Sequence, residues 1–295
     1  MTELPEPYED TIVPARDGRR LAVARWGCAG GLPVVSHHGT PMCRLDIPAA
    51  PELLNALGID LIMIDRAGYG RSTPLPGRTV AAAAADVVAA ADALGIERFA
   101  VHGVSGGGPH ALACAALLEH RVTRTACVVG VAPWNGRGRT FYDGMCEANI
   151  TEFETARRGR EAVEHYVAEI MVARDGDPAG LFEEWMDELP EPDRRAYRAP
   201  QTRALVDRAL DEALAETTAG WVDDDLAFVT DWGFQLSDIR SPVSVWHGAL
   251  DVLAPPIHAR MIAAEIPNAE LHIAPDHGHE LDHGPIFRWL CEEAT

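Results

Sequence analysis

The 295-residue sequence contains no lysine, and its 25 Lys-or-Arg positions are all arginine. This absence excludes chemistry that depends on a lysine amine, such as a Schiff base with pyridoxal phosphate, a lysine general base, or the lysine of a phosphate-binding P-loop. The chain is also poor in positive charge, with a formal net charge of −20. Because so acidic a surface repels phosphate backbones and anionic lipid, we expect neither a nucleic-acid partner nor a membrane partner.

Three other features are missing from the sequence. No apolar run approaches the roughly 20 residues that a membrane span needs. The first residues, MTELPEPYED, lack the basic and apolar segments of a secretory signal, so we expect a cytoplasmic protein. The six cysteines form no C-x-x-C pair, and we expect them to be reduced thiols that mostly fill the core.

Strand-like and helix-like segments alternate at both ends of the chain. The Asp17-Gly18 pair predicts a hairpin turn. Such alternation is typical of a mostly parallel sheet covered by helices on both faces, which is an α/β fold. Helical patterns fill residues 134–235, and they predict a helical insertion between a sheet core made of residues 1–133 and 236–295. The expected strands are 11–15, 19–27, 32–39, 58–65, 98–103, 124–133, 241–248 and 269–275. Outside the insertion, a helix is expected within 45–57, and helices are also expected at 79–95, 255–267 and 284–294.

A glycine-rich segment surrounds one serine. Gly103-Val104-Ser105-Gly106-Gly107 fits the pattern G-x-S-x-G between an expected strand and an expected helix. That context is typical of a nucleophile elbow, a sharp turn that exposes the serine hydroxyl. The alternatives are a helix start that packs or binds phosphate and a dinucleotide loop, but the segment does not align with G-x-G-x-x-G.

An acid and a histidine follow this serine, each just after an expected late strand. Asp251 lies after a late strand in SPVSVWHGALDV, and Gly278-His279 lies after the next strand. A serine hydroxyl is a poor nucleophile unless an oriented base takes its proton. Over nearly the whole chain, the sequence therefore resembles the α/β-hydrolase superfamily with its serine, acid and histidine. The resemblance implies that Ser105 is the nucleophile, His279 the base and Asp251 the acid.

The resemblance also extends to two loops. HHGTP at residues 37–41 occupies the place of the oxyanion loop, which implies that the backbone amides of Thr40 and Gly106 bind the oxyanion. His38 is then expected to be a structural loop residue. DRAGYGRS at residues 65–72 resembles the family pattern D-R-x-G-x-G-x-S, in which the aspartate and arginine brace neighbouring loops. A serine at the elbow argues against epoxide hydrolases and haloalkane dehalogenases, which use aspartate there.

Several polar residues have competing interpretations. His277 is the rival of His279 as the base, although the Gly-His pair favours His279. The acidic run Asp223–Asp225 suits the start of a helix, where the macrodipole favours negative charge. A metal site near the C-terminal end is disfavoured, because its histidines and aspartates have no recognised zinc spacing. The residues considered for that site are His272, Asp276, His277, Asp282 and His283.

These observations predict an α/β-hydrolase fold with an inserted helical cap. We expect a serine hydrolase that cleaves a small or medium carboxylic ester through an acyl-enzyme, with a small-molecule substrate and without cofactor or metal. The same residues also suit cleavage of an amide or carbon–carbon bond, or cofactor-free biosynthetic chemistry. A small-molecule receptor built on this fold is the alternative from another class, and assembly into a homo-oligomer is left open.

Overall fold

The computed structural model describes residues 4–292, so part of the segment MTELPEPYED lies outside the described residues. Within that range, eight strands form one sheet in the order β1-β2-β4-β3-β5-β6-β7-β8. The hairpin predicted at Asp17-Gly18 is confirmed, because β1 and β2 pair antiparallel on either side of it. The strands are β1 Glu9–Pro14, β2 Arg20–Gly27, β3 Leu32–His37, β4 Ile59–Ile64, β5 Phe99–Val104, β6 Val122–Val128, β7 Val243–Gly248 and β8 Glu270–Ala274.

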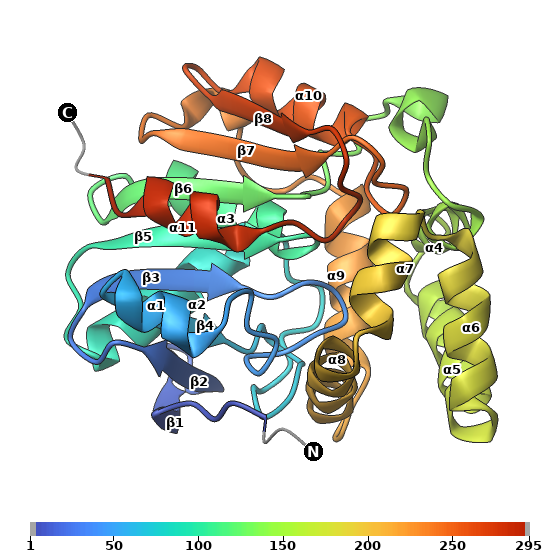
Figure 1. Cartoon of the computed structure of the whole chain (residues 1–295), viewed down its shortest axis with the longest axis horizontal. Coiled ribbons are helices and arrows are strands. Elements are labelled where there is room, and N and C mark those ends of the chain that lie inside the picture. The colour runs from blue at the N-terminus through green and yellow to red at the C-terminus, as the bar shows by residue number, and fades with distance from the viewer. Residues whose placement is uncertain (1–3, 293–295) are drawn as a thin grey trace.

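The sheet is parallel from β4 through β8, as the alternating pattern predicted. Apolar side chains of the strands pack on α2 and α3 on one face and on α1 and α11 on the other (Figure 1). The helix expected within 45–57 is confirmed, and it begins at Pro51, because proline suits the first turn of a helix and restricts the residue before it. These helices are α1 Pro51–Ala56, α2 Ala82–Ala93, α3 Gly107–Leu117, α10 Ile257–Glu265 and α11 His283–Leu290.

Between β6 and β7 the chain is helical, and we call residues 134–235 the insertion. Figure 1 shows it beyond the end of the sheet to which the arrows of β3, β6 and β7 point. In parallel sheets this is the edge where the loops after the strands meet. The insertion contains the 3-10 turn η1 Gly138–Tyr142 and the helices α4 Glu147–Ala156, α5 Arg160–Gly176, α6 Pro178–Glu188, α7 Glu191–Arg198, α8 Pro200–Ala213 and α9 Ala219–Val229, and the 3-10 turn η2 Leu236–Asp238 follows it.

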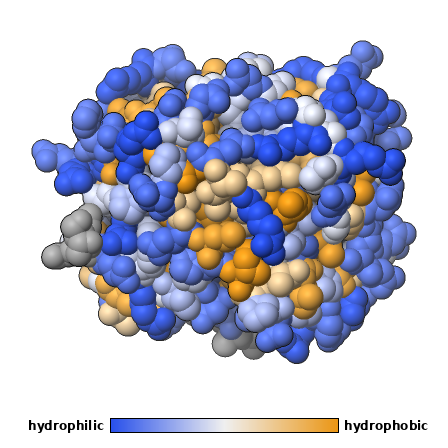
Figure 2. All heavy atoms as spheres, turned by 90° about the horizontal axis from the view of Figure 1, so that it is seen from above, coloured by the Kyte–Doolittle hydropathy of each residue, from blue (hydrophilic) through white to orange (hydrophobic). Residues whose placement is uncertain are grey.

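The face of the molecule above β8 and α10 is mainly hydrophilic (Figure 2). Figure 2, which views the molecule from above with β8 and α10 toward the viewer, shows an apolar stretch across the middle of a hydrophilic face. Apolar atoms of this kind are normal on a folded protein. In residues 4–292, no helix has both the length and the apolar character that a membrane crossing needs.

Candidate active site

Ser105 lies on a tight turn between β5 and α3. Its backbone has φ 53°, a left-handed conformation that is uncommon for a residue with a side chain. The turn is held by the Ser105 amide, which donates to the carbonyl of Val128 (2.9 Å), and by the Gly108 amide, which donates to the carbonyl of Ser105 (2.9 Å). This conformation between a strand and a helix is the strained geometry of a nucleophile elbow.

The glycines around Ser105 are required by close approach of other groups. A Cβ atom at Gly103 would collide with the carbonyl of Gly107 across the turn. A Cβ atom at Gly107 would collide with the carbonyl of His37, and one at Gly106 would collide with the side chain of Thr40. The glycine-rich sequence therefore lets the elbow press against the loop that follows β3.

Asp251 and His279 are brought together from the loops after β7 and β8. Oδ2 of Asp251 lies 2.8 Å from Nδ1 of His279. The same oxygen lies 3.1 Å from Nε2 of His247 at the end of β7, a partner that the sequence analysis did not identify. Oδ1 accepts hydrogen bonds from the amides of Leu253 (2.9 Å) and Ala254 (3.1 Å). Both carboxylate oxygens are therefore occupied, and the group is fixed in orientation.

Asp251 and His279 each stabilise the charged form of the other. Burial alone would raise the pKa of Asp251, but the charge of His279 and hydrogen bonds from both histidines hold it below its ordinary value. Burial likewise lowers the pKa of His279, yet the charge and hydrogen bond of Asp251 outweigh it, and the net pKa is raised above 6.5. A carboxylate that stabilises a protonated imidazole in this way suits a base that must carry a proton during a reaction.

Ser105 stands at the same edge of the sheet as this pair, because β5, β7 and β8 are parallel strands. Among residues 4–292, no hydrogen bond joins Ser105 Oγ to His279. Hydrogen bonds between a nucleophile and its base are often long without a substrate.

Asp193, on α7 of the insertion, holds the loop that carries His279. Its Oδ2 accepts from the amide of His279 (2.8 Å), and its Oδ1 accepts from the amide of Glu280 (3.0 Å). Gly278 makes this possible, because a Cβ atom there would collide with the Asp193 carboxylate. The side chain is fully buried. Sequence reasoning missed Asp193, and no local pattern links it to a histidine 86 residues later.

The loop after β3 places Thr40 beside the elbow. Within the described residues, the amides of Thr40 and Gly106 donate to no protein group, so they have the free N–H groups that an oxyanion hole requires. His38 has both ring nitrogens engaged, with Nδ1 donating to the carbonyl of Gly39 (2.7 Å) and Nε2 accepting from the amide of Arg66 (3.2 Å). His38 is thus held as a structural loop residue.

Two other histidines near the C-terminal end, His277 and His272, have surroundings that differ from those of His279. His277 is exposed, and its carbonyl accepts from the amide of Leu250 at 2.9 Å. His272 stacks on Trp246 with a centroid distance of 3.9 Å. In the part of the chain that the structure describes, no group of three or more His, Cys, Asp or Glu side chains could hold a metal ion.

The prediction for Asp223–Asp225 is wrong. The helix α9 begins at Ala219, so these residues lie past its first turn, where the macrodipole no longer favours them. All three are buried, and Asp223 and Asp224 accept hydrogen bonds from different residues. The apolar residues on both sides of the run draw this part of the helix into the interior.

Comparison with known proteins agrees with this geometry. The family model described as "alpha/beta hydrolase fold" matches residues 33–167. Over 258 residues the chain is 30% identical to a protein of Streptomyces lividans named non-heme chloroperoxidase. The aligned region covers 86% of this chain and 87% of the relative. The chain belongs to the α/β-hydrolase superfamily. The predicted family and fold class are thus confirmed.

Two further likenesses extend over most of this hydrolase. It is 31% identical over 245 residues to a Caulobacter sp. (strain K31) protein named as a carbamate hydrolase, RutD, with 80% of this chain and 82% of the relative covered. The crystal structure of a hydrolase from Pseudomonas aeruginosa PA01 superposes with a TM-score of 0.68 at 20% identity, covering 96% of this chain and 95% of that one. The chain is therefore an enzyme of the hydrolase class.

Proposed function

We propose that this α/β-hydrolase is a serine hydrolase that cleaves a small or medium carboxylic ester through an acyl-enzyme. The observation that carries the proposal is the left-handed backbone of Ser105, which lies at the same sheet edge as the hydrogen-bonded Asp251–His279 pair. A serine on a strained turn, at the sheet edge that also carries an oriented imidazole, is the arrangement that acyl transfer requires.

In the proposed reaction, Ser105 Oγ attacks the ester carbonyl while His279 Nε2 takes its proton. Asp251 keeps the Nδ1–H of the imidazole in place and stabilises the positive charge that forms. The amides of Thr40 and Gly106 bind the oxyanion of the tetrahedral intermediate. His279 then returns the proton to the leaving alcohol, and water releases the acyl group by the same steps.

The insertion is proposed to act as a cap over Ser105. It lies beyond the sheet edge where the candidate groups gather, and ligand pockets are mostly apolar with a few polar groups. Its aromatic side chains would then help to enclose the acyl or alcohol part of the substrate. The reaction needs no cofactor or metal, because the nucleophile, base, acid and oxyanion donors all come from the chain.

Hydrolysis of a carbamate or amide is the second candidate. It is favoured by the likeness to the Caulobacter protein named as a carbamate hydrolase. A carbamate carbonyl is attacked in the same way as an ester carbonyl and leads to a similar oxyanion. The two candidates therefore share every group named above and differ in the leaving group.

A fluorophosphonate probe tests the proposal together with p-nitrophenyl esters of increasing acyl length. We expect the wild type to be labelled and to turn over esters, and Ser105→Ala to lose both. Ser237→Ala, which removes an exposed serine, is the matched control and should behave as the wild type. Absence of labelling in the folded wild type would refute the nucleophile. Labelling without ester turnover would favour the second candidate.

A further inference from the structure

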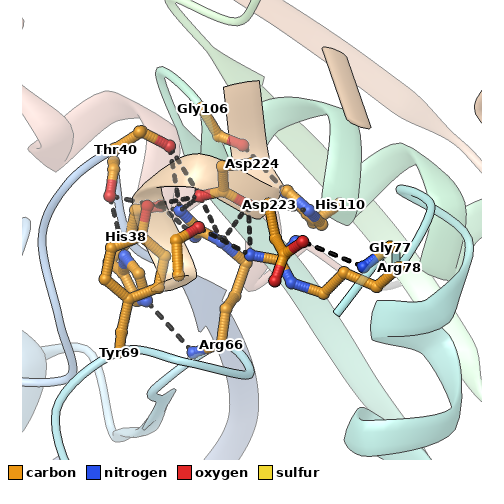
Figure 3. Close-up of polar contacts among 12 residues, drawn as sticks. His38, Thr40, Arg66, Tyr69, Gly77, Arg78, Gly106, His110, Asp223 and Asp224 are labelled. Atoms are coloured by element: carbon orange, nitrogen blue, oxygen red, sulfur yellow. Dashed lines mark hydrogen bonds and ion pairs between the residues drawn. The ribbon is translucent and has the colours of Figure 1, made fainter. Parts of the chain in front are cut away.

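Asp224 of α9 stands out among the buried groups that the proposed reaction does not use. It belongs to the insertion, yet its carboxylate lies among side chains of the sheet core, and it is fully buried. Figure 3 shows it at the centre of a polar network. Its partners are Thr40 Oγ1 (2.8 Å), Arg66 Nη2 (2.6 Å), Tyr69 Oη (2.9 Å) and Arg78 Nη2 (2.7 Å).

The first link from Asp224 to the candidate oxyanion hole is direct. Thr40 donates its hydroxyl to the carboxylate, and its side chain lies against the Cα of Gly106. The side chain of Thr40 thus contacts Gly106, the other residue whose amide is a candidate oxyanion donor. A shift of Thr40 toward or away from Asp224 changes the spacing of these two amides.

The second link passes through Arg66. Asp224 fixes the guanidinium with contacts to both Nε (3.1 Å) and Nη2 (2.6 Å). Arg66 in turn donates to the carbonyl of His38 and to the carbonyl of Gly39 (3.2 Å). The Gly39 carbonyl and the Thr40 amide belong to one peptide plane. Because a trans peptide is planar, fixing the carbonyl fixes the direction of the N–H on its other side.

The network is an ionised one. Burial alone would raise the pKa of Asp224, but the charges of Arg66 and Arg78 hold it well below its ordinary value. His110 lies 3.6 Å from the carboxylate, but burial keeps its pKa low and its Nδ1 is engaged by the carbonyl of Gly106 (2.8 Å). The positioning links therefore run through Thr40 and Arg66 and do not depend on His110.

From these contacts we infer that Asp224 is a positioning residue for the oxyanion hole: it aims the Thr40 amide at the reacting carbonyl and sets its distance from Gly106. The inference rests on the proposed function. An oxyanion donor acts mainly on the transition state, so loss of its position lowers kcat and leaves KM almost unchanged. A network that merely fastened the insertion to the core would instead lower stability without this selective effect.

The test compares Asp224→Asn with Asp223→Asn. Asp223 is the adjacent buried residue on α9, but it accepts from the amide of Gly77 (2.9 Å) and pairs with Arg160, away from the oxyanion loop. We expect Asp224→Asn to lower kcat for a p-nitrophenyl ester about 10- to 100-fold with KM within about twofold. Asp223→Asn should keep the wild-type kcat per folded molecule. Equal losses in the two variants would overturn the inference.

Thr40→Val supplies a milder change if Asp224→Asn does not fold. Valine keeps the shape and the backbone amide but removes the hydroxyl that Asp224 holds. We expect kcat to fall about tenfold in Thr40→Val and to recover in Thr40→Ser. Wild-type kcat in Thr40→Val would overturn the inference.

Amide hydrogen exchange separates this inference from the proposed function. In the proteins without substrate, exchange in residues 37–44 should be faster in Asp224→Asn and Thr40→Val than in the wild type, and unchanged in Asp223→Asn. Faster exchange supports the positioning role even if esters are not the substrates. Unchanged exchange in both Asp224→Asn and Thr40→Val contradicts it even if the esterase reaction is established.

Discussion

The sheet core and the insertion both place buried carboxylates at the candidate site, but these carboxylates have different partners. In the core, Asp251 contacts the imidazole of His279, the group that would carry a proton. In the insertion, Asp193 accepts backbone amides of the loop after β8, and Asp224 holds the loop after β3 through Thr40 and Arg66. The core therefore supplies the candidate reacting groups, and the insertion fixes the loops that carry them.

This difference suggests how substitutions in the two regions should differ. A change at Asp251 acts on the protonation and orientation of the base itself. A change in the insertion acts through a loop, so it should reduce the rate by misplacement and reduce stability by leaving buried donors unpaired. The three predictions below test this division.

The largest effect is expected for Asp251→Asn in the core. Asparagine cannot stabilise the imidazolium and favours the wrong tautomer of His279, so kcat for an ester should fall about 10⁴-fold. The control is Asp276→Asn, which changes an exposed aspartate of the neighbouring loop. Steady-state kinetics of the two variants provide the measurement, and a loss below about tenfold in Asp251→Asn would remove Asp251 from the proposed triad.

An intermediate effect is expected for Asp193→Asn in the insertion. Asparagine has one carbonyl oxygen, so the amides of His279 and Glu280 can no longer both be satisfied. We expect kcat to fall about tenfold through misplacement of the loop, and the free energy of unfolding to fall by about 1–3 kcal/mol. Kinetics and chemical denaturation measure the two effects.

The matched control for Asp193→Asn is Glu191→Gln, on the same helix but exposed. It should change neither quantity by much. If Asp193→Asn lost stability but kept the wild-type kcat, the insertion would stabilise the core without positioning its loops, and the comparison drawn above would fail.

The smallest effect is a displacement of the pH profile of the wild type. Because Asp251 raises the pKa of His279 despite its burial, protonation of the base begins at a higher pH than for an ordinary histidine. Only the neutral imidazole accepts a proton, so kcat/KM should be lost as the pH falls through a midpoint above 6.5. His277→Asn should have the same midpoint. A midpoint below 6.5, or one that moves in His277→Asn, would contradict the assignment of His279.

The sequence was sufficient for the parts of the candidate site that depend on local patterns. The glycines around Ser105 predict the tight turn, and Asp251 and His279 follow strands whose apolar runs are easily recognised. The parallel sheet could be predicted for the same reason. The segment 45–57 was expected to contain a helix, and Pro51 marks where that helix begins.

The links between the insertion and the core could not be predicted in this way. Asp193 contacts a loop 86 residues later, and Asp224 contacts a threonine 184 residues earlier. Such separations leave no spacing in the sequence. One feature of the sequence did point to these links. The acidic run at 223–225 lies between Trp, Val, Leu and Phe residues, and these apolar neighbours on both sides indicate that the run is buried. Buried carboxylates need partners, so this run indicated polar contacts inside the molecule.

The ion pairs of Asp224 also limit how a substrate could reach Ser105. Opening the whole insertion away from the sheet would separate this carboxylate from Arg66 and Arg78. It would break several buried polar contacts at once, because the same carboxylate also accepts the hydroxyl of Thr40. We therefore expect substrate and product to pass while α9 stays seated on the core, through movement of insertion helices that do not carry Asp224.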